Sequence, residues 1–132
     1  MRHRSYTIFS TPIALLTLTT AGIHFYLATQ HNTAMLRLGF LAAGIGFVGS
    51  LAALLAPIGF LSRLRPFAGL LLLCVDVAAI IGHLVVMGIV FEPLAIADKA
   101  AELALLILLI TDWLVAGSPE EARHEESSMR AA

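Results

Sequence analysis

Charged residues are scarce in this chain and cysteine is nearly absent. Only 13% of its 132 residues are Asp, Glu, Lys or Arg, whereas an ordinary soluble domain has about 25%. Eight basic residues against nine acidic ones give a formal net charge of −1, which excludes the cationic character of a nucleic-acid binder. The single cysteine, Cys74, cannot form an internal disulfide and is too few for a zinc-finger or iron–sulfur site.

Motifs of soluble enzymes are also missing. The sequence contains no HExxH, no CxxC and no glycine-rich phosphate loop. Cys74 lies between Leu73 and Val75, so we interpret it as a buried, small apolar residue rather than a nucleophile. These absences favour a role other than catalysis, although they leave the question open.

Long apolar segments are what the sequence has in abundance. Hydrophobic residues make up 59% of the chain, and its mean hydropathy is +0.92. A helix needs about 20 mostly apolar residues to cross hydrocarbon about 30 Å thick. The predicted fold is therefore all-α, a four-helix transmembrane bundle in up-down-up-down order. Its spans are expected at 12–29, 38–56, 67–91 and 94–116 of a single domain over residues 1–117, with a polar tail at 118–132.

A cleaved signal peptide is the alternative interpretation of the first span. Its length and the polar residues His24 and Tyr26 favour a retained helix instead.

The positions of the cations predict how the bundle sits in the membrane. Most arginines flank one side, so both termini are expected in the cytoplasm. The short loops and this arginine bias fit a multi-pass protein of a bacterial inner membrane. The cytoplasmic set is Arg2, Arg4, Arg63, Arg65, Arg123 and Arg130, and the remaining cations are Arg37 and Lys99.

Small residues recur at four-residue intervals in the second span. Such spacing lets membrane helices approach closely. We expect these residues to pack against another helix of the same bundle, and a homodimer interface is the alternative. They are Gly39, Ala42, Ala43, Gly46 and Ser50.

Polar residues in the other three spans fall on one stripe of each helix. Because lipid offers them no hydrogen-bond partner, each stripe is expected to face the bundle interior. The stripes are Thr17, Thr20, His24 and His31 in the first span, Asp76, Ile80, His83 and Met87 in the third, and Asp98, Glu102, Leu105, Leu109 and Asp112 in the fourth.

Depth along the helices predicts a polar layer in the outer half of the bundle. Its members lie roughly 8–12 Å from the outer ends of their spans. Lys99 and Glu102 are three residues apart and can neutralise each other. Asp76 is expected deeper, whereas Asp98 and Asp112 are expected close enough to helix ends to reach water. The predicted layer consists of His24, His83, Lys99 and Glu102.

Besides a membrane-embedded enzyme, which the missing motifs disfavour, three functions remain open, and we favour the first. In a small accessory or structural membrane protein, the polar layer would fix helix packing, since buried polar residues can give specificity without chemistry. In a metal- or haem-binding protein, His24 and His83 could be the axial ligands of haem b. The same histidines with Met87, and with Glu102 nearby, would suit copper. The positive charge of Lys99 counts against a bare cation there.

The third function is transport of an ion, a proton or a solute. Ionisable residues inside a membrane often mark such paths, and Asp76, Lys99 and Glu102 are the candidate relay groups. Four short spans make a small transporter, for which a homodimer is expected. The expected partners are therefore the lipid bilayer and either a second copy or a larger membrane complex, with no nucleic acid.

Overall fold

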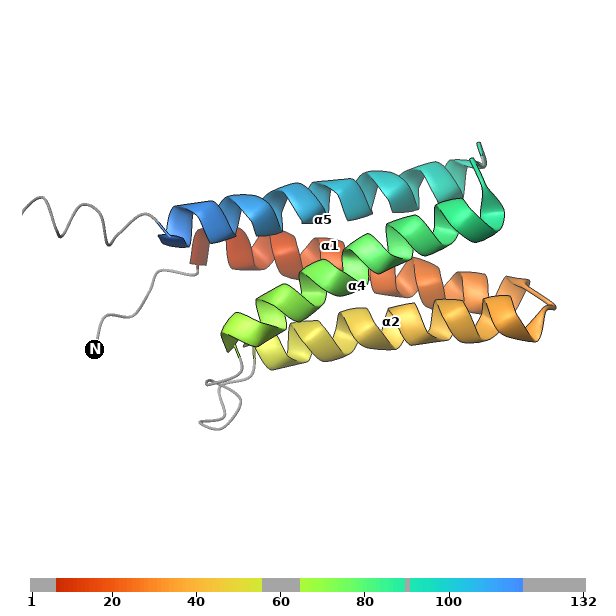
Figure 1. Ribbon diagram of the computed structural model, residues 1–132, viewed down its shortest axis with the longest axis horizontal. Coiled ribbons are helices and arrows are strands. Elements are labelled where there is room, and N and C mark those ends of the chain that lie inside the picture. Colours follow the sequence, from red (N-terminus) through yellow and green to blue (C-terminus); the bar gives the residue numbers. More distant parts are fainter. Residues whose placement is uncertain (1–6, 56–64, 90, 118–132) are drawn as a thin grey trace, which may run out of the picture.

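The computed structural model describes residues 7–55, 65–89 and 91–117, which fold into four α-helices without a β-strand (Figure 1). The predicted polar tail lies outside this part of the chain. So do most of the arginines that set the predicted orientation, which stays a prediction. The helices are α1 (Thr7–Gln30), α2 (Ala34–Leu55), α4 (Arg65–Met87) and α5 (Pro93–Gly117).

Two helix ends differ from the predicted spans for local backbone reasons. α1 begins at Thr7, so Pro12 lies inside the helix rather than at its start. The proline ring fixes φ at about −65°, which the helix tolerates at the loss of one N–H donor. α4 ends at Met87, before the predicted residue 91, because Gly88 adopts a positive φ of 69° and its N–H donates to the carbonyl of Leu84. A left-handed glycine is a common helix terminator.

The helices form a closed ring of contacts around one apolar core. α1 packs against α2 and α5, and α4 also packs against α2 and α5. In Figure 1, α4 begins beside α2 and crosses toward α5 along its length. Each helix contributes to the core, whose buried members are Ile13, Ala21, Phe47, Leu72, Leu105 and Leu109.

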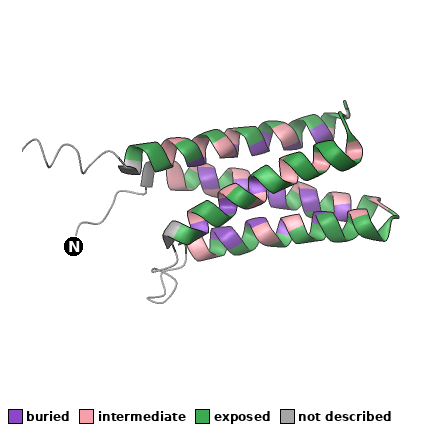
Figure 2. Cartoon of the chain, viewed as in Figure 1, coloured by how far each residue is buried: buried purple, intermediate pink, exposed green. Residues whose placement is uncertain are grey.

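The distribution of polarity is the reverse of that in a water-soluble bundle. Large apolar side chains such as Val85 and Trp113 are more than three-quarters exposed, whereas the carboxylates of Asp76, Asp98 and Glu102 are fully buried. Exposed residues follow the outer faces of all four helices in Figure 2. An apolar outside with a polar inside suits hydrocarbon as the surrounding solvent.

Three of the helices are long and apolar enough to cross a membrane: Phe9–Gln30, Ala34–Leu55 and Phe67–Met87. α5 is not among them, because four ionisable residues make the described part of this helix too polar for a candidate span. The three apolar helices are compatible with a multi-pass membrane protein. The ionisable residues of α5 are Asp98, Lys99, Glu102 and Asp112.

The expected burial of Cys74 is wrong. This residue is exposed, on a side of α4 where Phe67 and Leu71 share a shallow apolar groove with it. The cysteine was expected inside because its neighbours are apolar. In a chain with an apolar exterior, however, apolar neighbours do not distinguish the core from the lipid-facing surface.

Close helix approaches centre on two glycines of α2. A Cβ on Gly44 would lie 2.8 Å from Cε1 of Phe25 on α1, and one on Gly46 would lie 3.1 Å from Cγ1 of Val75 on α4. A larger residue at either position would therefore require the facing side chain, Phe25 or Val75, to move. Gly39, by contrast, has nothing within 4 Å of a Cβ.

Candidate functional site

His24 is the centre of the polar interior. It lies on the stripe of α1 that also carries Thr17 and Thr20, and all three are at most 2% exposed, so the predicted inward orientation of this part of the stripe is confirmed. The imidazole packs against the rings of Phe40 and Phe47 on α2, with centroid separations of 5.8 and 5.5 Å. Its Nδ1 donates a hydrogen bond of 2.9 Å to the carbonyl of Thr20.

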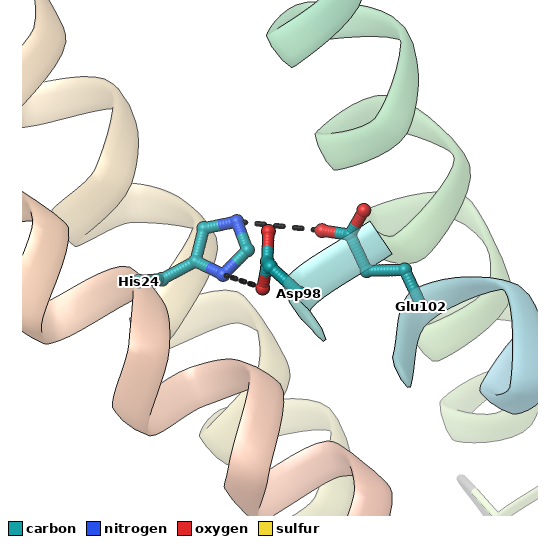
Figure 3. Close-up of side chains that lie close together, drawn as sticks. All are labelled: His24, Asp98 and Glu102. Atoms are coloured by element: carbon teal, nitrogen blue, oxygen red, sulfur yellow. Dashed lines mark ion pairs between the residues drawn. The ribbon is translucent and has the colours of Figure 1, made fainter. Parts of the chain in front are cut away.

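Two carboxylates of α5 face the other side of this ring. Oδ1 of Asp98 lies 3.6 Å from Nδ1 of His24, and Oε1 of Glu102 lies 3.5 Å from Nε2. Figure 3 shows both acids on the same side of the imidazole, with a dashed line from Nδ1 to Asp98 and another from Nε2 to Glu102. Both distances exceed that of a good hydrogen bond, and the contacts become ion pairs when the imidazole is protonated.

Lys99 engages the remaining oxygens of the same two acids. Its Nζ lies 3.1 Å from Oδ2 of Asp98 and donates a hydrogen bond to Oε2 of Glu102. The predicted pairing of Lys99 with Glu102 is therefore confirmed. His24, Asp98, Lys99 and Glu102 together form what we call the ionic cluster.

The charges of the ionic cluster can balance internally. Asp98 and Glu102 are 0% exposed, and the side chain of Lys99 is 21% exposed. When the imidazole carries a proton on both nitrogens, two positive charges face two negative ones. Such balance matters in a membrane, where one charged residue at the bilayer centre costs about 2.5–3.5 kcal/mol on insertion scales.

The geometry also bears on metal binding. Ligand atoms of His24, Asp98 and Glu102 all lie within 4.8 Å of one another, which is close enough to surround an ion. However, the two carboxylates are nearest to different nitrogens of the imidazole, and a single ion can bind only one of these nitrogens. Lys99 also occupies an oxygen of each acid. An ion at this position would therefore have to displace Lys99 from both acids.

Some buried polar atoms of the described residues lack a hydrogen-bond partner. Both oxygens of Asp76 on α4 are in this group, as is Nδ1 of His83. Oxygens of Asp98 and Glu102 are in it too, although ion pairs reach them. Unsatisfied buried groups are rare in proteins and each needs an explanation.

The other predicted site residues lie apart from the ionic cluster. His83 and Met87 line a cavity between α1, α2 and α4, and His24 forms part of the same wall. Gly39, Ala42 and Ala43 line this cavity from α2. The structure thus separates the predicted polar layer into the ionic cluster on α1 and α5 and a cavity beside it, with His24 common to both.

Asp98 is the member that sequence reasoning misplaced. It was expected to reach water from near the end of its helix, but it is fully buried against His24 and Lys99. Its position four residues before Glu102 puts both acids on one face of α5. That spacing, with Lys99 adjacent, was the available signal for a shared site.

Comparisons with known proteins give no family. Neither protein-family models, nor curated proteins, nor solved structures give a significant match to this chain.

Proposed function

We propose that the protein is a small integral membrane protein of accessory or structural type, in which the ionic cluster fixes α1 against α5. The observation that carries this proposal is the bridging position of His24. One imidazole from α1 faces two buried carboxylates of α5 through its two nitrogens. A side chain that contacts two partners through two different atoms restricts both the register and the rotation of the helix that bears it.

α5 is proposed as the fourth span, which completes an up-down-up-down bundle. The ionisable residues that distinguish it from the other helices are the ones that lie inside: Asp98 and Glu102 are buried, and Lys99 pairs with both. Pairing lowers the cost of placing these groups at membrane depth. Short connections from Gln30 to Ala34 and from Met87 to Pro93 support alternating helix directions.

Orientation and location follow the arginine bias of the sequence. Both termini are proposed in the cytoplasm and the protein in a bacterial inner membrane. Under this arrangement the ionic cluster lies in the outer half of the bundle. A second copy or a larger membrane complex remains the proposed partner.

Replacement of the central imidazole tests the structural role. In His24→Phe the ring contacts with Phe40 and Phe47 can persist, but both ion pairs with α5 are lost. We expect a lower melting temperature of the detergent-purified protein, because two buried acids are left with one cation. His31→Phe is the matched control, since His31 stacks on Phe40 at 5.1 Å without touching the ionic cluster. Equal melting of both variants and the wild type would contradict the proposal.

Metal binding is the second candidate function, and the grouping of His24, Asp98 and Glu102 favours it. Here Lys99 would have to leave the carboxylates when an ion enters. Elemental analysis of protein purified from metal-replete cells distinguishes the two proposals. Near-stoichiometric metal that His24→Phe abolishes would support a metal centre, and its absence in the wild type would favour the ionic cluster as a purely structural device.

A further inference from the structure

The cavity between α1, α2 and α4 has a volume of about 400 Å³. This lies in the range of about 300–1,000 Å³ that is usual for small-molecule sites. Apart from His24 and His83, its lining consists only of apolar residues and glycine. Size and lining together fit a small, mostly apolar molecule.

The space arises where α4 leaves α2. The two helices are in close contact at Gly46 and Val75, where a Cβ on the glycine would lie 3.1 Å from the valine. Toward the cavity, Gly39 on α2 and Gly82 on α4 have nothing within 4 Å of a Cβ. In Figure 1, α4 turns away from α2 and crosses to α5 along this part of its length. The small residues here leave room instead of closing the interface.

The cavity opens on the apolar exterior. Met35 and Val86 belong to its lining and are 71% and 49% exposed. Both residues lie within helices that are apolar enough to cross a membrane. An entrance lined by such apolar side chains favours a neutral, lipid-soluble molecule.

The polar group that a ligand would meet is His83. Its Nδ1 is buried and has no hydrogen-bond partner among the described residues. His24 is a weaker candidate for a hydrogen bond to a ligand, because its Nδ1 already donates to the carbonyl of Thr20 and its Nε2 faces Glu102. An unpaired polar atom in apolar surroundings costs free energy until a partner arrives.

We infer that this cavity binds a neutral, lipid-soluble molecule that carries a hydroxyl group, with the hydroxyl hydrogen-bonded to the imidazole of His83 and the apolar body against α2 and α4. A hydroxyl both donates and accepts, so it satisfies either tautomer of the imidazole. The inference is independent of the structural role proposed for the ionic cluster.

The probe pair 1-naphthol and naphthalene tests this inference, with protein in phosphatidylcholine nanodiscs and empty nanodiscs as the blank. The two molecules differ by one hydroxyl group. Titrations of protein with ¹⁵N-labelled histidine report both affinity and the chemical shift of the His83 ring. We expect 1-naphthol to bind the wild type about fivefold more tightly than His83→Phe, the effect of one hydrogen bond. Naphthalene should bind both alike, and His83→Gln should restore part of the preference for 1-naphthol.

Cavity filling tests the location. Gly82→Leu should abolish binding of both probes, because Gly82 lines the cavity and the new side chain would occupy its space. Gly69→Leu is the matched control on α4, since Gly69 also has nothing within 4 Å of a Cβ but does not line the cavity. Equal affinity for the two probes in the wild type would overturn the inference and indicate a site for an acyl chain. Binding that survives Gly82→Leu would overturn it as well.

Discussion

Nε2 of His24 on α1 lies 3.5 Å from Oε1 of Glu102 on α5, and both side chains are buried. The other nitrogen of the same ring, Nδ1, lies 3.6 Å from Oδ1 of Asp98. Lys99 pairs with the second carboxylate oxygen of each acid, which the imidazole does not contact. α1 and α5, which are far apart in sequence, are thus connected by polar contacts in the buried interior of the bundle.

Loss of the Glu102 charge should destabilise the bundle. Glu102→Gln keeps the shape of the side chain but leaves Lys99 and His24 with one acid instead of two. We expect the free energy of unfolding to fall by about 1.5–3 kcal/mol, the usual worth of a hydrogen bond to a charged group. Reversible unfolding in mixed micelles measures this change.

Asp112→Asn is the control for that experiment. It removes an acid from the same helix at a half-buried position outside the ionic cluster. We expect a change within about 0.5 kcal/mol. Similar losses in the two variants would show that the effect comes from charge on α5 in general and not from the ionic cluster.

Removal of the Asp76 carboxyl, unlike that of Glu102, should not lower the stability of the bundle. Its side chain is 0% exposed, and neither oxygen has a hydrogen-bond partner in the described part of the chain. Asp76→Asn replaces a carboxyl by a neutral group of the same shape, which is cheaper to bury. We expect unchanged or higher thermal stability. Proton or solute flux into proteoliposomes should also be unaffected, and a loss of flux would instead support the transport hypothesis.

Removal of Lys99 should create metal affinity. Lys99→Ala frees an oxygen on Asp98 and one on Glu102, while His24 remains within 4.8 Å of both acids. Carboxylate and imidazole ligands suit Co²⁺, whose visible absorption reports binding. We expect the Co²⁺ band in Lys99→Ala and not in the wild type, with loss of the band when His24→Phe is added. A wild type that binds Co²⁺ equally well would show that Lys99 does not protect the site.

Packing between α1 and α2 should depend on Gly44. A leucine there would meet the ring of Phe25, which a Cβ alone already approaches to 2.8 Å. We expect Gly44→Leu to cost about 1–3 kcal/mol of unfolding free energy, as overpacking usually does. Gly49→Leu lies on the same helix with nothing within 4 Å of a Cβ, so its melting should match the wild type. A tolerated Gly44→Leu would mean that Phe25 moves freely.

The fold was largely predictable because hydropathy and helix length determine it. All four predicted spans correspond to helices, and the polar stripe of α1 is buried at Thr17, Thr20 and His24. The failures have physical reasons. The end of α4 depends on the positive φ of Gly88, and the position of Cys74 depends on helix rotation, which apolar neighbours do not reveal when the exterior is apolar too.

The site was predictable only in part. The i,i+3 spacing indicated the pair of Lys99 with Glu102, since local pairs follow from helix geometry. The polar stripe predicted that Asp98 faces the interior, but its place near the start of α5 suggested contact with water, and its full burial depends on the lateral position of α1 against α5. Nor did the cavity at Gly39 and Gly82: the same small residues that allow helices to approach also leave space where α4 diverges from α2.

A double-mutant cycle between His24 and Glu102 tests the central claim most directly. The free energy of unfolding is measured for the wild type, His24→Phe, Glu102→Gln and the double variant under one set of micelle conditions. If the imidazole holds α1 to α5 through Glu102, the two changes are coupled by at least about 1 kcal/mol. The parallel cycle of His24→Phe with Asp112→Asn should give no coupling. Additivity within about 0.3 kcal/mol between His24 and Glu102 would contradict the account.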